Sequence, residues 1–302
     1  MNTSLNFNER VAERLEGMSP AEQRVVRYFQ DNREEVLIAS AAALAEKAET
    51  SDATVVRATK ALGFAGLEEL RRTLAAELRN SLSPAERLSR TLGVVGASLP
   101  AAFETTLETQ IQSLEDLRRT ITPELFQAAI EGMIGAKRVL VFGLGPSSAV
   151  ADYLVFQLTR FGLEAACLSN TGLLFADDLR RLRAGDFVVM LAYSRVYTEL
   201  SALLDEIRRL GLGSLLLTDT LAATLRHRVG TVLPVARGRA DMLSLHTATL
   251  GLIETLLVGI ASQRPAETLA NLRSLNEARE KLAGRAMNLP VSPEGGAKPR
   301  TP

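Results

Sequence analysis

Glycines and serines gather in one short stretch where the chain could hold a small anion. Gly143 and Gly145 allow a tight turn and a close approach of the backbone to a ligand, and Ser147 and Ser148 add two hydroxyl groups. An apolar run precedes these residues and a helical pattern follows them, so they predict the turn between a strand and a helix. The unpaired N–H groups at the start of such a helix attract phosphate or carboxylate groups.

This glycine motif is incomplete as a nucleotide fingerprint. Ser148 stands where the third glycine of G-x-G-x-x-G is expected, and no Gly-Lys-Ser/Thr of a P-loop follows. From these residues alone two interpretations stay open. The stretch is either an anion site or an ordinary strand-to-helix turn without a ligand.

Helix start and stop signals recur near the N-terminus. Ser40 and Ser51 each stand where a helix N-cap is expected, and Gly63 stands where the second of these helices should end. The spacing predicts short helices over 41–48 and 52–62. Two short helices joined by a tight turn are typical of a helix-turn-helix, whose second helix enters the major groove of DNA.

Basic side chains on the second of these helices favour DNA as its partner. Arg57 and Lys60 lie on the face opposite Val55 and Leu62, so both can reach bases or phosphates together. Acidic residues slightly outnumber basic residues between 1 and 80, so net charge argues against DNA and keeps a plain helical bundle as the alternative. The predicted DNA-binding residues are the cap Ser51 and the exposed Thr54, Arg57 and Lys60.

Whole-chain composition restricts the partners further. The 302 residues include 35 Lys or Arg and 35 Asp or Glu, so no global field attracts nucleic acid or a membrane, and such a partner needs a local patch. The single cysteine, Cys167, excludes an internal disulfide and a cysteine-rich zinc site, and its apolar surroundings predict a buried, inert thiol. The N-terminal residues lack the pattern of a signal peptide, and no apolar run reaches membrane-spanning length. We therefore expect a cytoplasmic protein that contacts no membrane.

Apolar strands alternate with helices in the C-terminal part of the chain. This order predicts an α/β domain with a parallel five-stranded sheet covered by helices on both faces, with ligands at the carboxyl ends of the strands. The loops after Phe142, Tyr193 and Thr218 would then form the site, and a long apolar helix over 243–260 would follow the sheet. The expected strands cover 138–142, 164–169, 186–193, 213–218 and 231–235.

The two motifs together resemble one known family. The sequence SDATVVR at 51–57, followed by LGF at 62–64, is similar to the helix-turn-helix of RpiR-type (MurR/RpiR) bacterial transcription regulators. Members of that family carry a C-terminal sugar isomerase (SIS) domain, and residues 143–148 with Ala151 and Gly162 resemble the first phosphate loop of that domain. The resemblance covers roughly residues 18–262, and two motifs in the family order are more specific than either alone.

The resemblance implies an all-α helix-turn-helix N-terminal domain and a SIS-like α/β C-terminal domain. One departure is Glu49, which stands where the turn of the family usually has glycine. Linker composition places the boundary between the two domains. The expected parts are a DNA-binding domain at 1–80, a linker at 81–105, a SIS-like effector-binding domain at 106–262, and a helical extension with a disordered tail at 263–302.

The loop after the third strand departs most from the family. SIS domains usually have Ser-x-Ser-Gly-x-Thr here, whereas this chain reads AYSRVYT from Ala192 to Thr198. Ser194 matches the second serine, and Arg195 replaces the glycine. Arg195 either points inward and clamps an anion or lies solvated on the rim. By the resemblance, the predicted effector-binding residues are Gly143, Gly145, Ser147, Ser148, Ser194, Arg195, Thr198, Thr218 and Ser244.

The resemblance implies a transcription regulator rather than an enzyme. We expect a homodimer or homotetramer that binds an inverted-repeat DNA operator and senses a small anionic metabolite, such as a phosphosugar. No catalytic residue, metal or cofactor is predicted, because His227 and His246 lack suitable neighbours in the sequence. Two alternatives remain: a sugar-phosphate isomerase with an accessory helical domain, and a SIS-fold regulator with a vestigial pocket.

Overall fold

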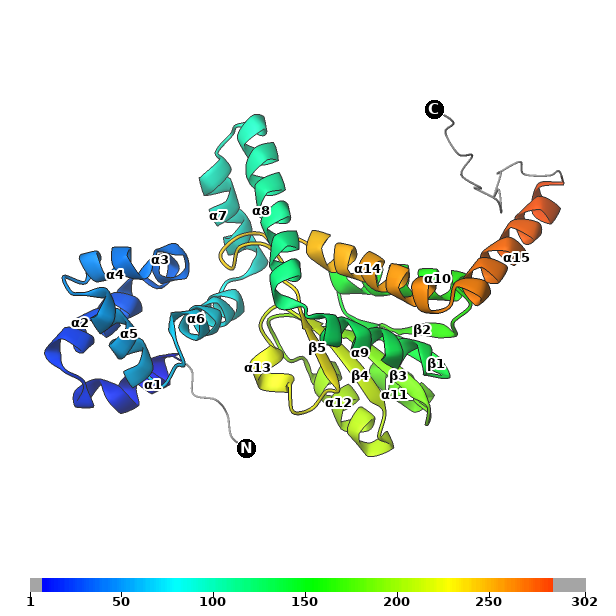
Figure 1. Ribbon diagram of the computed structural model, residues 1–302, viewed down its shortest axis with the longest axis horizontal. Coiled ribbons are helices and arrows are strands. Elements are labelled where there is room, and N and C mark those ends of the chain that lie inside the picture. The colour runs from blue at the N-terminus through cyan, green and yellow to red at the C-terminus, as the bar shows by residue number, and fades with distance from the viewer. Residues whose placement is uncertain (1–6, 285–302) are drawn as a thin grey trace, which may run out of the picture.

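A computed structural model describes residues 7–284 of the chain, and its N-terminal part is helical (Figure 1). Buried apolar side chains from these helices form one core, which includes Val25, Phe29, Leu44, Val55 and Leu62. The apolar side chains of the two short helices therefore face the core, as predicted for Val55 and Leu62. The elements are α1 (Phe7–Arg14), a 3-10 turn η1 (Leu15–Gly17), α2 (Pro20–Asp31), α3 (Arg33–Ile38), α4 (Ala41–Lys47), α5 (Asp52–Ala61) and α6 (Leu67–Ser81).

Serine caps start the helices where the sequence predicts them. The Ser40 hydroxyl accepts a hydrogen bond from the N–H of Ala43 at 3.1 Å, and the Ser51 hydroxyl accepts one from the N–H of Thr54 at 3.4 Å. Each bond satisfies one of the N–H groups that a helix leaves unpaired at its start. Gly63 follows α5 with φ +83°, as a C-terminal glycine should.

The turn between α4 and α5 contains a backbone conformation that suits glycine. Glu49 has φ +50°, in the left-handed region, where an L side chain meets its own backbone. The N–H of Thr50 nevertheless donates to the carbonyl of Ala45 at 2.8 Å, so the turn closes as the family turn would. The turn therefore places a non-glycine residue in a strained backbone conformation.

The segment expected as a linker is helical. Residues 81–105 contain α7 (Pro84–Val95) and the beginning of α8 (Leu99–Thr120). The two helices form a hairpin (Figure 1). Sequence reasoning did not predict these helices, because Ser83 and Ser98, each followed closely by proline, have linker composition but are helix N-caps. Ser83 and Glu86 form a complete capping box.

The C-terminal part contains the predicted parallel sheet. The strands are β1 (Arg138–Gly143), β2 (Ala165–Leu168), β3 (Asp186–Leu191), β4 (Gly213–Thr218) and β5 (Thr231–Pro234), in the order β2-β1-β3-β4-β5. Gly143 pairs with Leu191, and Thr218 pairs with Pro234, so the ends of these strands lie at one edge. β3 is two residues shorter than predicted, because Ala192 and Tyr193 leave the ladder with β1.

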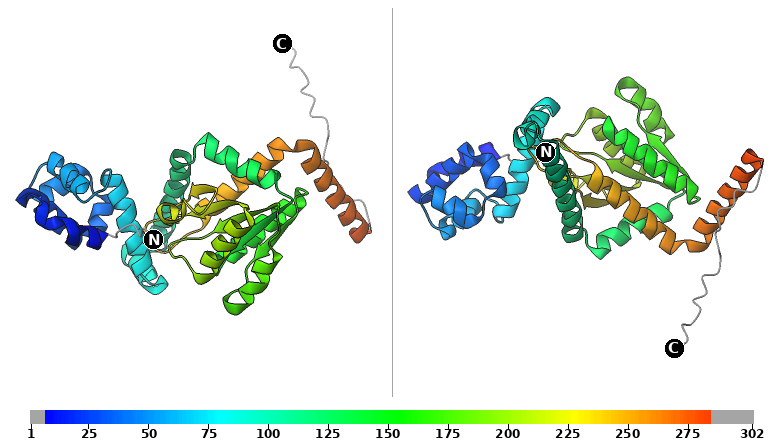
Figure 2. Two further views of the ribbon diagram at one scale, coloured as in Figure 1. Left: turned by 90° about the horizontal axis from the view of Figure 1, so that it is seen from below. Right: turned by 90° about the horizontal axis from the view of Figure 1, so that it is seen from above.

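Helices cover both faces of the sheet (Figures 1 and 2). Val139 and Val141 face a core shared with α9, α10 and α14, whereas Leu140 and Phe142 face a second core shared with α11, α12 and α13. This alternation follows from the two-residue period of a strand. The covering elements are α9 (Pro123–Ile134), α10 (Pro146–Arg160), a 3-10 turn η2 (Gly172–Leu174), α11 (Phe175–Arg181), α12 (Thr198–Leu210), α13 (Ala222–Leu225) and α14 (Thr247–Gln263).

Two boundaries at the end of the chain differ from the prediction. α14 begins at Thr247 rather than at residue 243, so Ser244 lies in the preceding loop and does not open the helix. α15 (Pro265–Ala283) extends away from the sheet, as Figure 1 shows. The tail expected to be disordered, residues 288–302, lies outside the described residues. None of the helices between residues 7 and 284 combines the length and apolar character needed to cross a membrane.

We predict that Glu49→Gly raises the free energy of unfolding by about 0.5–1 kcal/mol, because glycine adopts a positive φ without steric cost. Urea unfolding of the two proteins measures the difference. Glu46→Gly is the matched control, since Glu46 is exposed within α4, where glycine should cost about 1 kcal/mol. Equal destabilisation by both substitutions would show that the turn is unstrained.

Candidate functional site

The loop after β1 brings the backbone close to the start of α10. A Cβ added to Gly143 would lie 2.6 Å from the carbonyl oxygen of Ser147, so only glycine fits this approach. Gly145 precedes the helix with φ +56° and ψ −133°, which is also a glycine conformation. The first turn of α10 therefore lies at the carboxyl edge of the sheet, where the positive end of the helix dipole would attract an anion. The N–H groups of Ser147 and Ser148 donate to the carbonyls of Leu144 at 3.2 Å and Gly145 at 3.0 Å within this turn.

The two serines of this turn have different surroundings. The Ser148 hydroxyl donates to the carbonyl of Gly145 at 2.8 Å, and its oxygen remains able to accept a second hydrogen bond. The Ser147 side chain is buried within the turn. The predicted residues Gly143, Gly145, Ser147 and Ser148 thus lie together at one helix start.

The loop after β3 is held in a tight, strained turn at Ser194. This residue has φ +56°, and the N–H of Arg195 donates to the carbonyl of Tyr193 at 2.5 Å across it. The N–H of Ser194 donates to the Asp219 carboxylate, which follows β4, at 3.1 Å. A non-glycine residue with positive φ at this edge indicates a conformation that its neighbours impose.

Arg237 is the cation at this edge of the sheet, and sequence reasoning missed it. Its Nε donates to Asp219 Oδ2 at 3.1 Å, and its Nη2 donates to the Ser194 hydroxyl at 2.9 Å. The guanidinium also stacks over the Tyr193 ring, 4.2 Å from its centroid. The signal was available, because Arg237 follows β5 by three residues and the carboxyl ends of parallel strands share one edge.

This ion pair is almost removed from water. The side chain of Arg237 is 12% exposed and that of Asp219 is 1% exposed. Charges with so little exposure persist only when they are paired and hydrogen-bonded, as both are here. The arrangement keeps a permanent positive charge beside Ser194.

The rings of Tyr193 and His246 pack against each other beside Arg237. The Tyr193 hydroxyl and the Thr249 hydroxyl lie 3.0 Å apart, and burial raises the pKa of Tyr193 well above its usual value. His246 packs edge-on against Tyr193, with ring centroids 5.6 Å apart. Burial first, and then the charge of Arg237, lower the pKa of His246 below 6.5. A neutral imidazole thus lies beside a permanent cation.

The remaining predicted effector residues lie apart from this group. Arg195 and Thr198 are exposed on the rim, so the inward cation is Arg237 rather than Arg195. Thr218 is fully buried, and its hydroxyl accepts from the N–H of Leu221 at 3.1 Å, which fixes the turn after β4. The Ser244 hydroxyl accepts from Nη1 of Arg87 on α7 at 3.0 Å.

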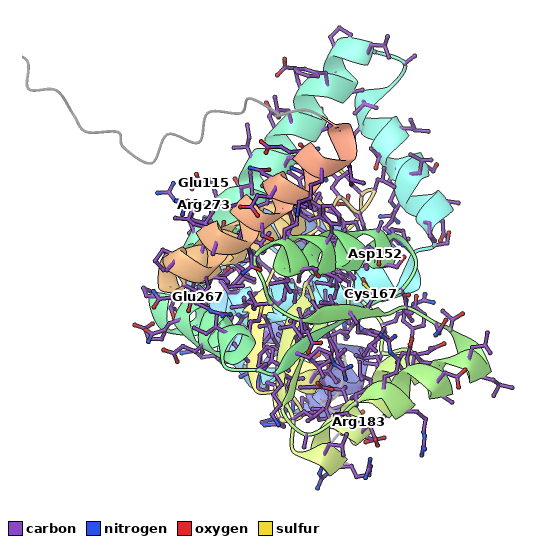
Figure 3. The ribbon with its side chains drawn as sticks, turned by 90° about the vertical axis from the view of Figure 1, so that its right-hand side faces the viewer. Glu115, Asp152, Cys167, Arg183, Glu267 and Arg273 are labelled. Atoms are coloured by element: carbon purple, nitrogen blue, oxygen red, sulfur yellow. The ribbon has the colours of Figure 1, made fainter. Side chains whose placement is uncertain are left out.

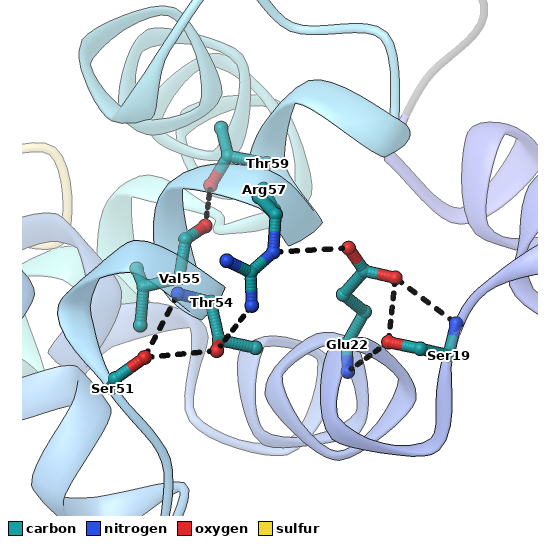
Figure 4. A network of polar contacts seen from close by, with 7 residues as sticks. All are labelled: Ser19, Glu22, Ser51, Thr54, Val55, Arg57 and Thr59. Atoms are coloured by element: carbon teal, nitrogen blue, oxygen red, sulfur yellow. Dashed lines mark hydrogen bonds and ion pairs between the residues drawn. The ribbon is translucent and has the colours of Figure 1, made fainter.

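The candidate DNA surface on α5 is organised around Arg57 (Figure 4). Its Nη2 donates to the Thr54 hydroxyl at 2.9 Å, and its Nε lies 3.8 Å from the Glu22 carboxylate. Hydrogen bonds from Ser19 lower the pKa of Glu22, so the carboxylate stays charged beside the guanidinium. The side chain of Arg57 is nevertheless 61% exposed, which leaves it accessible to a partner.

Thr54 corrects one part of the DNA-surface prediction. Its side chain is buried rather than exposed, because its hydroxyl lies 3.0 Å from that of Ser51 and accepts from Arg57. Ser51 and Thr54 therefore position the helix and its arginine. Lys60 lies exposed in the last turn of α5, on the side opposite the buried Val55.

Cys167 on β2 is half-buried beside Asp152 of α10 (Figure 3). Burial, followed by a hydrogen bond with Asp152, raises the pKa of its thiol to about 12. The thiol is therefore protonated near neutral pH and is a poor nucleophile, in agreement with the predicted inert role. Over the described residues, no group of three His, Cys, Asp or Glu side chains is arranged to hold a metal ion.

Two family models match the chain. Residues 5–81 match the helix-turn-helix domain of the rpiR family, and residues 132–259 match the SIS domain. Curated relatives include the bifunctional protein glk of Paraburkholderia xenovorans, 26% identical over 277 residues, which are 88% of this chain and 42% of that protein. The chain thus spans about two fifths of the length of these relatives.

Solved structures of similar fold include two regulators. The sugar isomerase domain of the RpiR transcription factor from Sphaerobacter thermophilus has a TM-score of 0.54 and 26% identity, over 59% of this chain and 98% of that chain. The Vibrio vulnificus NanR protein complexed with ManNAc-6P has a TM-score of 0.55 and 22% identity, over 92% and 99% of the two chains. The second likeness supports the fold alone.

We predict that His246 makes stability fall as the pH is lowered. The pKa of His246 is lower in the folded state than in the unfolded chain, where it is about 6.5. At pH values between these two pKa values the unfolded chain binds more protons than the folded protein. The free energy of unfolding therefore decreases as the pH is lowered through this range. Urea unfolding between pH 7.5 and 5 should show wild type losing its advantage over His246→Gln. The exposed His227→Gln serves as the control, and a constant difference across this range would contradict the prediction.

Proposed function

Because the chain is an RpiR-type regulator, with a helix-turn-helix domain of the rpiR family before a SIS domain, we propose that it binds an inverted-repeat operator as a dimer and senses an anionic metabolite. A dimer with two-fold symmetry requires an operator with the same symmetry. Each copy would place α5 in one major groove. The metabolite would bind at the carboxyl edge of the sheet.

The exposed guanidinium of Arg57 supports the DNA contact. It is held by Thr54 and paired with the Glu22 carboxylate at 3.8 Å, so phosphate or guanine can compete for it. Because its rotamer is already restricted, it loses less conformational entropy when it binds. Lys60, on the same surface, would add a phosphate contact.

The nearly buried Arg237 is the observation that carries the metabolite proposal. A guanidinium beside Ser194, at the same edge as the α10 N-terminus, favours a ligand with a phosphate or carboxylate group. Vibrio vulnificus NanR, which shares the fold, was solved with ManNAc-6P. A sugar phosphate is therefore the first class to test. The proposed contacts are the α10 turn, Ser194 and Arg237, with Arg195 and Thr198 at the rim.

The isomerase alternative is less well supported by this site. Isomerisation of a sugar phosphate needs a general base. The candidates are Asp219, which contacts Arg237, and His246, which contacts the Tyr193 ring. Asp219 accepts from the Ser194 N–H through Oδ1 and pairs with Arg237 through Oδ2, so both of its carboxylate oxygens are already engaged. The site thus suits binding better than catalysis.

We predict that Arg57→Ala weakens operator binding by about 1–3 kcal/mol, roughly fivefold to 150-fold, while the fold is retained. Operators selected from a random duplex library would supply the DNA, and fluorescence anisotropy at fixed salt would measure the affinity. Arg273→Ala, on the distant α15, is the matched control and should leave affinity unchanged. Equal affinities for wild type and Arg57→Ala would place the DNA surface elsewhere.

We predict that sugar phosphates raise the thermal midpoint of the protein, because a ligand of the folded state stabilises it by mass action. The double variant Asp219→Asn with Arg237→Gln, which avoids a lone buried charge, should lose most of the shift. Arg239→Gln, on the same loop, should keep it. No shift with sugar phosphates or small carboxylates would favour the vestigial pocket.

A further inference from the structure

The loop between β5 and α14, residues 235–246, touches both the candidate effector site and α7. Its first part inserts Arg237 into the site, and its last part bonds to the helix that follows the DNA-binding domain. We infer that this loop is the element that couples the effector site to the DNA-binding domain. The inference rests on the proposed function and adds the route by which ligand would alter DNA binding.

At the site end, the loop is fixed by Arg237. The guanidinium joins it to Asp219 after β4 and to Ser194 after β3. His246, at the other end of the loop, packs on Tyr193, the ring over which Arg237 stacks. An anion that draws Arg237 away from Asp219 or Ser194 must therefore disturb both ends of the loop.

A backbone hydrogen bond joins the two ends of the loop. The N–H of Leu245 donates to the carbonyl of Arg237 at 3.1 Å, so the loop is closed at its base. Within it, Arg239 pairs with Asp241 at 3.2 Å. A displacement of Arg237 is passed directly to Leu245 and its neighbours, because one hydrogen bond separates them.

Two hydrogen bonds from Leu243 and Ser244 attach the loop to α7. The N–H of Leu243 donates to the Thr91 hydroxyl at 2.9 Å, and Nη1 of Arg87 donates to the Ser244 hydroxyl at 3.0 Å. These contacts join segments about 150 residues apart in sequence, as the separations of 152 and 157 show. Ser244 thus has a use in α7 attachment that the family resemblance did not suggest.

The attachment to α7 leads on to the DNA-binding domain. Only Leu82 and Ser83 separate α7 from α6, and α6 contributes Leu70 and Leu74 to the core around α5. In Figure 1, α6 lies between the helical domain and the α7–α8 hairpin. A tilt of α7 would therefore change the placement of the DNA-binding domain of each copy, and hence the spacing of the two recognition helices in a dimer.

The loop also has space in which to move. A cavity of about 400 Å³ lies between α8 and the loop residues Gly238 and Arg239. Gly238 has φ +81°, and a hinge of this kind absorbs changes in backbone angles. Coupling needs two arrangements with different ligand affinity, and an open space beside a glycine hinge allows a second arrangement.

Hydrogen exchange without ligand or DNA tests this route. Asp219→Asn keeps a side chain of the same shape but leaves Arg237 without its counter-charge, which loosens the loop at the site. Thr91→Val removes the acceptor on α7. We expect Asp219→Asn to speed exchange of the Leu243 N–H at least fivefold, and Thr91→Val to speed exchange of the Ser194 N–H similarly, because coupling is reciprocal. Rates are taken relative to the Val188 N–H in β3, which reports global unfolding.

Arg239→Gln is the matched control, since it alters a cation of the same loop that bonds to neither end. It should change the Leu243 and Ser194 rates less than twofold. If Asp219→Asn and Thr91→Val each alter only their own end, the loop does not couple the two and the inference is overturned. Because no ligand or DNA is present, this outcome is distinguishable from failure of the proposed function, which the thermal-shift and anisotropy measurements decide.

Discussion

The nearly buried ion pair between Arg237 and Asp219 is the interaction on which the candidate site depends. It joins the loops after β4 and β5, and Asp219 also fixes the loop after β3 by accepting the Ser194 N–H. Removing one partner would leave a charge with almost no access to water, which typically costs about 3–5 kcal/mol. The pair therefore sets the shape of the candidate site.

The DNA-binding domain also contains an arginine–carboxylate pair, between Arg57 and Glu22, but this pair is weaker. Arg57 is positioned by Thr54 and Glu22, but its side chain stays 61% exposed, so its pairing with Glu22 is screened and easily exchanged. Arg237 is 12% exposed and more tightly held. One arginine is thus exposed and weakly paired, whereas the other is nearly buried and held within the candidate site.

Much of the fold follows from local rules that are legible in sequence. Serine caps, glycine stops and apolar alternation located the short helices and the strands, because each rule depends on residues within one turn or one pleat. The same rules also misled, since Ser83 with Pro84 was interpreted as linker composition although it is a helix start. In the site, the turn at Gly143 to Ser148 and the match at Ser194 were also legible, since neighbouring residues define them.

What the sequence by itself determined was therefore the order of a helical helix-turn-helix domain before an α/β domain with a parallel sheet. Only the tertiary structure decided which cation enters the carboxyl edge of that sheet, where Thr54 points and what Ser244 contacts. Arg195 and Arg237 are equivalent as letters, yet one is exposed and the other stacks on Tyr193 beside Asp219. Burial and pairing of a charge depend on residues far apart in the chain, and only the packed fold brings those residues together.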